Sequence, residues 1–148
     1  MPHEVTPALA QDLVAIRALL ERSGLPTSDL ESARPEFAVI RETGQVVAAG
    51  ALQRFGSSAL LRSVVVAPDR RGTGLGHSIV NELEHRASAT RITHLILLTE
   101  TAADFFTRRG YHVIERSSAP EDMQQSDEFR SLCPSSAICM AKSAPFST

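Results

Sequence analysis

A glycine-rich segment in the middle of the chain carries the strongest chemical signal. It reads Val64-Val65-Val66-Ala67-Pro68-Asp69-Arg70-Arg71-Gly72-Thr73-Gly74-Leu75-Gly76. Glycine lets backbone N–H groups approach a ligand without interference from a Cβ atom. Where a helix begins at such a segment, its free N–H groups and positive dipole end favour a phosphate or pyrophosphate. Arg70 and Arg71 add positive charge beside it. The segment therefore predicts a strand, a phosphate-binding turn and a helix.

Three other interpretations of this segment compete with a phosphate site. A Walker loop is excluded, because no Gly-Lys-Ser/Thr follows Gly76. A dinucleotide fold needs G-x-G-x-x-G, whereas Gly72, Gly74 and Gly76 alternate. The third is a plain strand-to-helix turn with no ligand. The β-branched strand ending at Pro68, the arginine pair and the amphipathic helix that follows favour the phosphate site over the plain turn.

The apolar periodicity around this segment predicts one layered α/β or α+β domain over residues 1–148. A first helix is expected to begin with Thr6 as N-cap and Pro7 as its first helical residue. The expected helices are 6–20, a short one within 27–34, 75–87, 102–109 and 122–132. The expected strands are 37–41, 46–55, 59–67, 94–99, 111–115 and 137–141. The apolar stripe of the helix at 75–87 should face the core, and its polar residues, Glu84 among them, should face elsewhere.

Length and charge exclude several classes of function. A chain of 148 residues forms about one domain. It has 15 Lys and Arg against 17 Asp and Glu, and this formal net charge of −2 argues against a nucleic-acid partner. No apolar run approaches the roughly 20 residues of a membrane span, and the N-terminus has no signal pattern. We therefore expect a cytoplasmic protein without a membrane or nucleic-acid partner.

The two cysteines, Cys133 and Cys139, are too few for a disulfide scaffold. An extended chain would hold them ~20 Å apart at ~3.3 Å per residue, too far for a disulfide or a shared metal ion. A turn at Pro134-Ser135 would shorten that distance. We expect two ordinary buried thiols and no metal site.

Two motifs at a characteristic separation carry a family resemblance. Arg71-x-x-Gly74-x-Gly76 after a strand is similar to the acetyl-CoA pyrophosphate loop of the GNAT N-acetyltransferases. The downstream match consists of Leu97-Leu98-Thr99, Ala102-Ala103-Asp104-Phe105-Phe106 and Gly110-Tyr111. It resembles the family's strand 5, the helix after it and an aromatic-x-x-x-Gly-aromatic signature. The resemblance implies a mixed, twisted sheet of about six to seven strands with splayed strands 4 and 5, flanked by helices. It also implies acetyl-CoA as co-substrate and no metal.

Within that superfamily, two groups resemble the chain. The stretch at 60–63 resembles the start of strand 4 in both, and the stretch at 99–106 is similar to the short N-acetylglutamate synthase domains. The tail at 129–142 resembles the arsenic-resistance acetyltransferases. The resemblance implies an N-acetyltransferase that acts on the amine of a small, glutamate-like amino acid or analogue, with an organoarsenical as the analogue in the arsenic-resistance group.

Other functions remain open at this point. One alternative is acetylation of glutamate itself, as by an N-acetylglutamate synthase, or of another primary amine. A second is a catalytically inactive, acetyl-CoA-binding regulatory module. Similar proteins commonly form homodimers, although no segment of this sequence establishes one.

The resemblance also implies which residues hold the cofactor. Peptide groups of strand 4 would pair with the pantetheine arm and polarise the thioester carbonyl as charge develops on its oxygen. The expected cofactor-binding residues are Val64, Val65, Val66, Arg71, Gly72, Thr73, Gly74, Leu75, Gly76, Phe106 and Arg109.

The groups that transfer protons are where the chain departs from the family. Many members have Tyr at the position of Phe106, which has no proton to give to the leaving thiolate. Tyr111, the only tyrosine, is the candidate acid, and water, Cys133 and Ser135 are the alternatives. Glu100, just past strand 5, is either the general base or a solvated loop carboxylate.

Arg62 is embedded in an otherwise apolar strand. A buried, unpaired arginine is costly, so Arg62 either emerges at an edge or meets an anion. A guanidinium suits a substrate carboxylate, and Arg62 is the candidate for binding it, together with Ser63 and Thr99. Arg54 and Arg130 are weaker candidates.

Overall fold

A seven-stranded mixed sheet runs through the protein, in the order β1-β2-β3-β4-β5-β7-β6. The structure is a computed structural model that describes residues 3–146. Its strands are β1 (Thr6–Pro7), β2 (Glu36–Glu42), β3 (Gln45–Phe55), β4 (Ser58–Val66), β5 (His94–Thr99), β6 (His112–Val113) and β7 (Ile138–Ser143). Its α-helices are α1 (Leu13–Arg22), α2 (Leu30–Ala33), α3 (Leu75–Ala89), α4 (Ala103–Arg108) and α5 (Glu121–Gln124). Its other helical turns are η1 (Ala10–Asp12), η2 (Pro68–Arg70), η3 (Arg116–Ser118) and the π-helix η4 (Glu128–Leu132).

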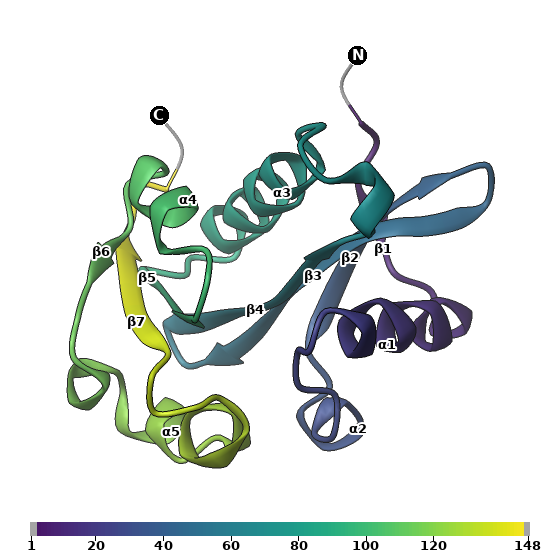
Figure 1. The fold of residues 1–148 in the computed structure, drawn as a ribbon. Coiled ribbons are helices and arrows are strands. Elements are labelled where there is room, and N and C mark those ends of the chain that lie inside the picture. The colour runs from purple at the N-terminus through teal and green to yellow at the C-terminus, as the bar shows by residue number, and fades with distance from the viewer. Residues whose placement is uncertain (1–2, 147–148) are drawn as a thin grey trace.

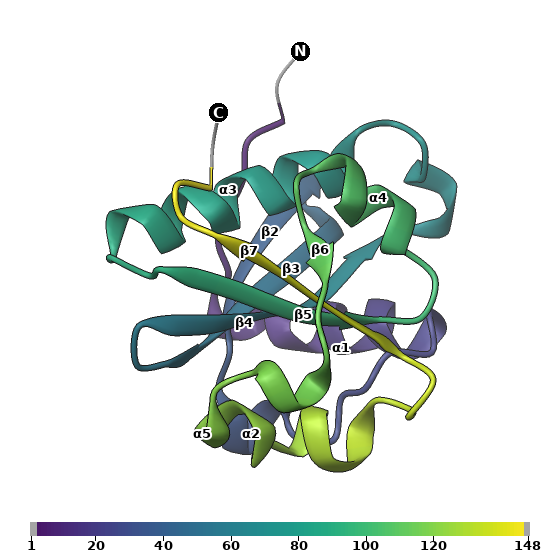
Figure 2. The same cartoon turned by 90° about the vertical axis from the view of Figure 1, so that its left-hand side faces the viewer.

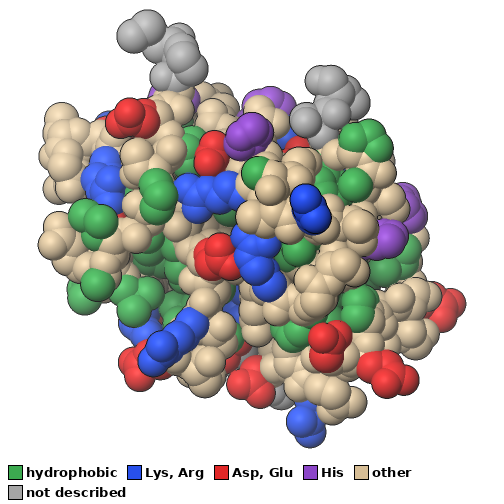
Figure 3. All heavy atoms as spheres, turned by 180° about the vertical axis from the view of Figure 1, so that it is seen from behind, with side chains coloured by type: hydrophobic (Ala, Val, Ile, Leu, Met, Phe, Trp, Pro, Cys, Tyr) green, Lys and Arg blue, Asp and Glu red, His purple; other side chains and the backbone are tan. Residues whose placement is uncertain are grey.

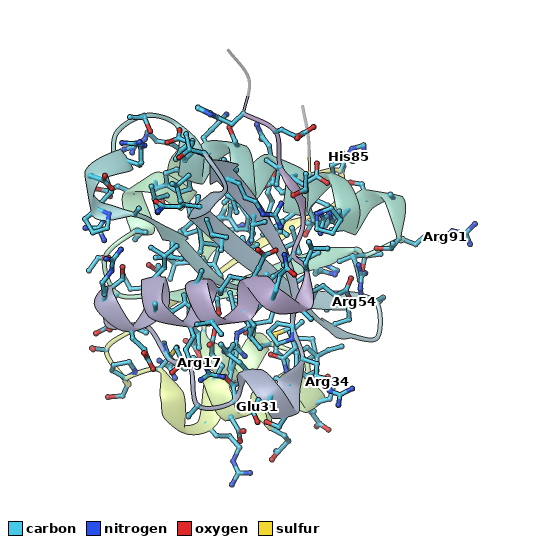
Figure 4. All side chains as sticks on the ribbon, turned by 90° about the vertical axis from the view of Figure 1, so that its right-hand side faces the viewer. Arg17, Glu31, Arg34, Arg54, His85 and Arg91 are labelled. Carbon is cyan, nitrogen blue, oxygen red and sulfur yellow. The ribbon has the colours of Figure 1, made fainter. Side chains whose placement is uncertain are left out.

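Helices cover both faces of the sheet. Helices α3 and α4 lie on one face, and α1, α2 and α5 lie on the other (Figures 1 and 2). On the second face, Arg17 of α1 and Glu31 of α2 form an ion pair at 3.7 Å, near the bottom of Figure 4. Acidic and basic side chains are interspersed over the surface in Figure 3. Among residues 3–146, no helix has the length and apolar character needed to cross a membrane.

Close packing of α3 on the sheet depends on Gly50 in β3. A Cβ atom at this position would lie 2.5 Å from Cγ2 of Ile79 and 3.1 Å from Cδ1 of Leu83. Since Ile79 and Leu83 are fully buried, neither side chain has free space to move into. The missing side chain thus sets how closely α3 approaches β3, and with it the position of the glycine segment before α3.

The sheet forks between its two central strands. β4 and β5 are parallel and pair only at Ser58–His94, Ala59–Leu95 and Leu60–Ile96. Beyond these pairs, β4 follows β3 to Val66, whereas β5 follows β7 to Thr99. The register of β4 against β3 also shifts here, and Ser63 has a φ of 58°, so a β-bulge lies at the start of the fork. The predicted splaying of the two strands is confirmed.

The layered fold, the 37–55 hairpin and the strand at 94–99 are confirmed, but the predicted start of the first helix is wrong. Thr6 and Pro7 form β1 and pair with β2. The Thr6 hydroxyl accepts a hydrogen bond from Arg41 at 2.9 Å and caps nothing. Asp12 instead accepts a hydrogen bond from the N–H of Leu9 at 2.7 Å, where the helical turns begin. A tertiary strand pairing thus overrides the local capping signal.

Two predicted elements near the C-terminus are shorter than expected. The strand at 111–115 reduces to β6, which leaves Tyr111 just outside it. The helix at 122–132 divides into α5 and η4, with a break at residues 125–127. The break lets a new helical turn begin at Glu128. The side chain of Glu128 is buried under the sheet.

Candidate functional site

The fork leaves one edge of β4 without a strand partner. Residues 61–66 of β4 have no partner on the β5 side. The side chain of Val65 is buried, while those of Val64 and Val66 pack partly buried against the core. Apolar side chains and an unpaired backbone edge therefore coexist in the same residues, as the prediction for Val64, Val65 and Val66 requires. Such an edge can donate hydrogen bonds to an extended ligand and accept hydrogen bonds from it.

The glycine segment joins this edge to a helix whose N-terminus is open. β4 leads through η2 into Gly72 and Gly74, whose φ angles are 80° and 87°, and α3 begins directly afterwards. No side chain caps the helix, and residues 71–74 are exposed. Leu75 is 1% exposed and anchors the first turn in the core. The free N–H groups of a 15-residue helix thus face open space, which is suited to a phosphate.

Two predicted cofactor residues next to these glycines also lie where a phosphate could reach them. Thr73 is exposed, and its hydroxyl donates to the carbonyl of Arg70 at 2.5 Å. A Cβ atom at Gly76 would lie 3.7 Å from Cγ2 of Val66, an ordinary van der Waals contact, so the first turn of α3 packs beside the end of β4.

The two arginines of the segment have different surroundings. Arg70 is hydrogen-bonded to Glu42 of the β2–β3 hairpin, and this contact raises the pKa of its guanidinium. Arg71 is exposed and makes only a 3.2 Å contact with the hydroxyl of Ser23. Arg71 is therefore the one of the pair that can turn toward a bound phosphate without breaking an ion pair.

The predicted role of Arg109 at the cofactor phosphates does not fit its contacts. Its side chain is 9% exposed and donates to Glu84 at 3.0 Å and to Asn81 at 2.6 Å, with His77 also 2.6 Å away. All three partners belong to α3. Arg109 therefore ties the end of α4 to α3 and is not free to bind a phosphate. Its Nε is buried and has no hydrogen-bond partner among the described residues.

Tyr111 is also held in the core, which argues against its predicted role as the acid. Its hydroxyl donates to Glu84 at 2.8 Å, and Lys142 of β7 lies 3.2 Å from the same carboxylate oxygen. Burial, followed by the negative charge of Glu84, raises the pKa of Tyr111 well above its ordinary value. The hydroxyl is directed at α3 and not at the fork. Phe106 packs edge-on against the Tyr111 ring and has no hydroxyl. Neither aromatic therefore offers a proton to a ligand.

Glu84 is a buried residue that the sequence analysis placed wrongly. Its side chain is 2% exposed and is bonded by Tyr111, Arg109 and Lys142. The signal was present, because Glu84 follows Val80 by four residues and so lies on the apolar stripe of α3. A helical wheel drawn strictly by position would have placed this carboxylate in the core.

Arg62 lies on the α2 side of the fork and meets carboxylates of the chain itself. Its Nη1 and Nη2 donate to the two oxygens of Asp29 at 2.6 and 2.7 Å. Nη1 also donates to Gln53 at 2.9 Å, and Nε donates to the hydroxyl of Ser63 at 3.2 Å. Nη2 lies 3.2 Å from Glu128. The expectation that a buried Arg62 meets an anion is confirmed, but the anion is Asp29, and no nitrogen is left for a substrate carboxylate while this network holds.

The charge of Arg62 is stable in these surroundings. Burial alone would lower the pKa of the guanidinium, but the hydrogen bonds to Asp29 and the charges of Glu128 and Asp29 raise it. Asp29, Arg62 and Glu128 are at most 4% exposed. This trio joins three separate segments, because Asp29 precedes α2, Arg62 lies in β4 and Glu128 opens η4.

The remaining predicted residues lie around the same fork. Glu100 is exposed in the loop after β5, and Thr99 accepts a hydrogen bond from the N–H of Ala102 at 3.0 Å.

Cys133 is half-buried, and burial, followed by the charge of Glu128, raises the pKa of its thiol to about 12. Cys139 is buried in β7, and both cysteines are free, as expected. Ser135 is exposed. Among the described residues, no group of His, Cys, Asp and Glu could hold a metal ion.

Comparisons with known proteins identify the family of this arrangement. A model described as acetyltransferase (GNAT) domain matches residues 33–113, more than half of the chain. The amino-acid acetyltransferase of Pasteurella multocida is 26% identical over 136 residues, 84% of this chain and 31% of that protein. The amino-acid acetyltransferase of Ralstonia nicotianae is 30% identical over 98 residues, 65% of this chain and 22% of that protein. The chain thus spans less than a third of the length of these relatives.

Solved structures show the same fold. A Mycobacterium tuberculosis protein in complex with CoA and NLQ has a TM-score of 0.81 and 27% identity, covering 95% of this chain and 98% of its own. The N-acetylglutamate synthase from Neisseria gonorrhoeae, complexed with coenzyme A and N-acetyl-glutamate, also has a TM-score of 0.81. Its identity is 19%, with coverage of 95% of this chain and 34% of its own.

Proposed function

The chain belongs to the GNAT acetyltransferase family, and from this premise we propose that it transfers the acetyl group of acetyl-CoA to the amine of a small, glutamate-like amino acid or analogue. The observation that carries the proposal is the continuity of two open features. The unpaired edge of β4 leads, through Gly72 and Gly74, directly into the uncapped start of α3. An extended arm with a pyrophosphate at its end fits these two features in sequence.

The chain's own residues account for binding of the donor. The N-terminus of α3 and Arg71 would hold the pyrophosphate, and the backbone of Val64–Val66 would pair with the pantetheine arm. Acetyl-CoA supplies a thioester whose carbonyl oxygen gains negative charge during transfer. A peptide N–H on the open edge of β4 is suited to stabilise that charge. Phe106 is 6% exposed, and its ring packs against those of Phe105 and Tyr111.

The acceptor class rests on the relatives. Those reported above are named amino-acid acetyltransferases, and one structural neighbour is named with N-acetyl-glutamate. The resemblance of the tail at 129–142 to the arsenic-resistance acetyltransferases extends the proposal to organoarsenical amino acids.

One observation favours a second candidate, a regulatory module that binds acetyl-CoA without turnover. Phe106 has no hydroxyl, and the only tyrosine hydroxyl is directed at Glu84. An enzyme then needs another proton source for the thiolate. Burial, followed by the charge of Glu128, raises the pKa of the Cys133 thiol to about 12, which makes this thiol a poor proton donor to a thiolate.

Thermal unfolding with acetyl-CoA tests the proposed function. At ~100 times its dissociation constant, a ligand adds ~2.7 kcal/mol of stability, which raises Tm by roughly 5–11 °C for a domain of this size. Gly74→Asp places a negative charge at the start of α3 and should abolish the increase. Gly74→Asn is the matched control, because it has the same size and tolerates a positive φ without the charge. No increase in wild type would exclude both the enzyme and the regulatory module.

A further inference from the structure

Three segments distant in the sequence meet on one side of the fork. The loop before α2 contributes Asp29, β4 contributes Arg62, and η4 contributes Glu128. Figures 1 and 2 show α2 and α5, which precedes η4, on the same face of the sheet, opposite α3 and α4. The three residues therefore meet on the face of the sheet opposite α3, whose N-terminus follows the glycine segment.

The charges at this meeting point are unequal. Asp29 takes a two-point contact with both terminal nitrogens of Arg62, at 2.6 and 2.7 Å, and so neutralises the guanidinium. Glu128 has a single 3.2 Å ion pair with the same guanidinium, although it is 4% exposed. Cys133, the nearby thiol, keeps its proton and adds no charge. Glu128 is therefore a surplus carboxylate in a place that water scarcely reaches.

A surplus buried carboxylate is complementary to an amine acceptor. An amino acid brings its amine as an ammonium ion, which must lose a proton before it can attack a thioester. We propose that Glu128 receives the ammonium group of the acceptor in the fork and takes up its proton. This proposal rests on the proposed acetyltransferase function and names the base that such a function requires.

The proton and electron balance of the step is complete. The ammonium gives one proton to Glu128, and the freed amine forms a bond from nitrogen to the acetyl carbon. The bond from that carbon to sulfur then breaks, and its electron pair leaves on the sulfur. The second proton of the nitrogen passes to the sulfur, which gives the amide and CoA as a free thiol, and Glu128 then releases its proton to water.

The surroundings of Glu128 suit a general base. Burial raises its pKa, the charge of Asp29 raises it further, and Arg62 acts against both. A carboxylate whose pKa is raised toward neutral pH is a stronger proton acceptor than a solvated one. Glu100, the base expected from the sequence, is exposed and has no such surroundings. The two glutamates thus make opposite predictions in the same assay.

The test compares Glu128→Gln with Glu100→Gln. The first variant keeps an oxygen that Arg62 can contact and removes only the charge and the proton site. Thiol release from acetyl-CoA is followed with L-glutamate as the acceptor, over a range of pH. If L-glutamate is not turned over, the same comparison uses the slow hydrolysis of acetyl-CoA, in which Glu128 would deprotonate water. We expect Glu128→Gln to lower kcat/KM by ~10²–10⁴-fold and to remove the acidic limb of the pH profile.

Controls separate this inference from the proposed function. Both variants should keep the stabilisation by acetyl-CoA, and Glu121→Gln, at an exposed residue of α5, is the control that should keep the wild-type rate and pH profile. Glu128→Asp, which retains a carboxylate, should recover part of the rate and the acidic limb, which a merely structural role would not predict. A wild-type rate and pH profile in Glu128→Gln would overturn the inference, while loss of acetyl-CoA binding by wild type would overturn the proposed function and the inference with it.

Discussion

Replacing Arg62 with methionine leaves two carboxylates buried without their cation. Asp29 is 3% exposed and Glu128 is 4% exposed, and both lose a partner that lies within 3.2 Å. Removing one member of a buried ion pair costs about 3–5 kcal/mol, because a charge remains in a place of low dielectric. For a domain of this size that corresponds to a decrease in Tm of roughly 6–20 °C. We expect this decrease at pH 8.

The pH dependence of the Arg62→Met variant distinguishes charge from packing. Without Arg62, burial raises the pKa of the Glu128 carboxyl group in the folded state above its unfolded value. The folded state then binds more protons than the unfolded state, so the free energy of unfolding falls as pH rises. The penalty should therefore shrink between pH 8 and pH 5, as Glu128 becomes protonated. A loss caused by packing alone would be the same at both pH values.

Arg54→Met is the matched control for this experiment. Arg54 of β3, labelled in Figure 4, forms an ion pair with Glu36, but their side chains are 30% and 51% exposed. Such an exposed pair contributes about 0–1 kcal/mol. Urea unfolding of both variants at pH 8 and pH 5 measures the difference. If Arg62→Met unfolds within about 1 kcal/mol of wild type at both pH values, the account of the buried trio is refuted.

Four further perturbations test other parts of the structure. Gly50→Ala should lower the free energy of unfolding by about 1–3 kcal/mol, because its Cβ would lie 2.5 Å from Ile79; an unchanged urea midpoint would contradict the close packing of α3. Glu84→Gln should lower the free energy of unfolding by about 3–5 kcal/mol in thermal unfolding, since two cations lose their buried partner. Tyr111→Phe removes one hydrogen bond and should lower the free energy of unfolding by about 1 kcal/mol. Iodoacetamide should modify Cys133 slowly at pH 8, because its thiol has a pKa of about 12, and mass spectrometry showing rapid modification would argue against that environment.

Much of the fold and of the donor site could be predicted from the sequence, because short-range patterns determine them. The glycine segment 72–76 lies between a β-branched strand and an amphipathic helix, and each of these signals is local. The strand at 94–99 is bounded by polar residues and matches β5 at both ends. The resemblance to a family motif predicted that strands 4 and 5 splay apart, which the apolar pattern alone does not indicate.

The buried trio of Asp29, Arg62 and Glu128 could not be predicted, because it depends on contacts between distant residues. Asp29 and Arg62 are 33 positions apart, and nothing near either residue indicates that they form a two-point contact. Arg62 was rightly expected to meet an anion, but sequence pattern cannot distinguish an anion of the chain from one of a substrate. Glu128 lies in a polar stretch and is buried only because η4 folds under the sheet.

The same limitation applies to two other residues. Arg109 and Tyr111 follow the short helix α4 and were expected to serve the cofactor and the leaving thiolate. In the structure both bond to Glu84, which lies 25 and 27 positions earlier on α3. A single buried carboxylate thus holds both side chains against α3, and its burial was visible only as a position on the helical stripe.

The most direct test of the central claim is detection of the acetylated product. Wild-type protein is incubated with acetyl-CoA and a panel of amino acids that begins with L-glutamate and its analogues, and mass spectrometry follows product formation, with Gly74→Asp as the control that should not bind the donor. We predict an N-acetylated amino acid and free CoA in equal amounts from wild type and neither from Gly74→Asp. If wild type binds acetyl-CoA but leaves it intact with every amino acid, the chain is not an amino-acid acetyltransferase and the regulatory module is the better account.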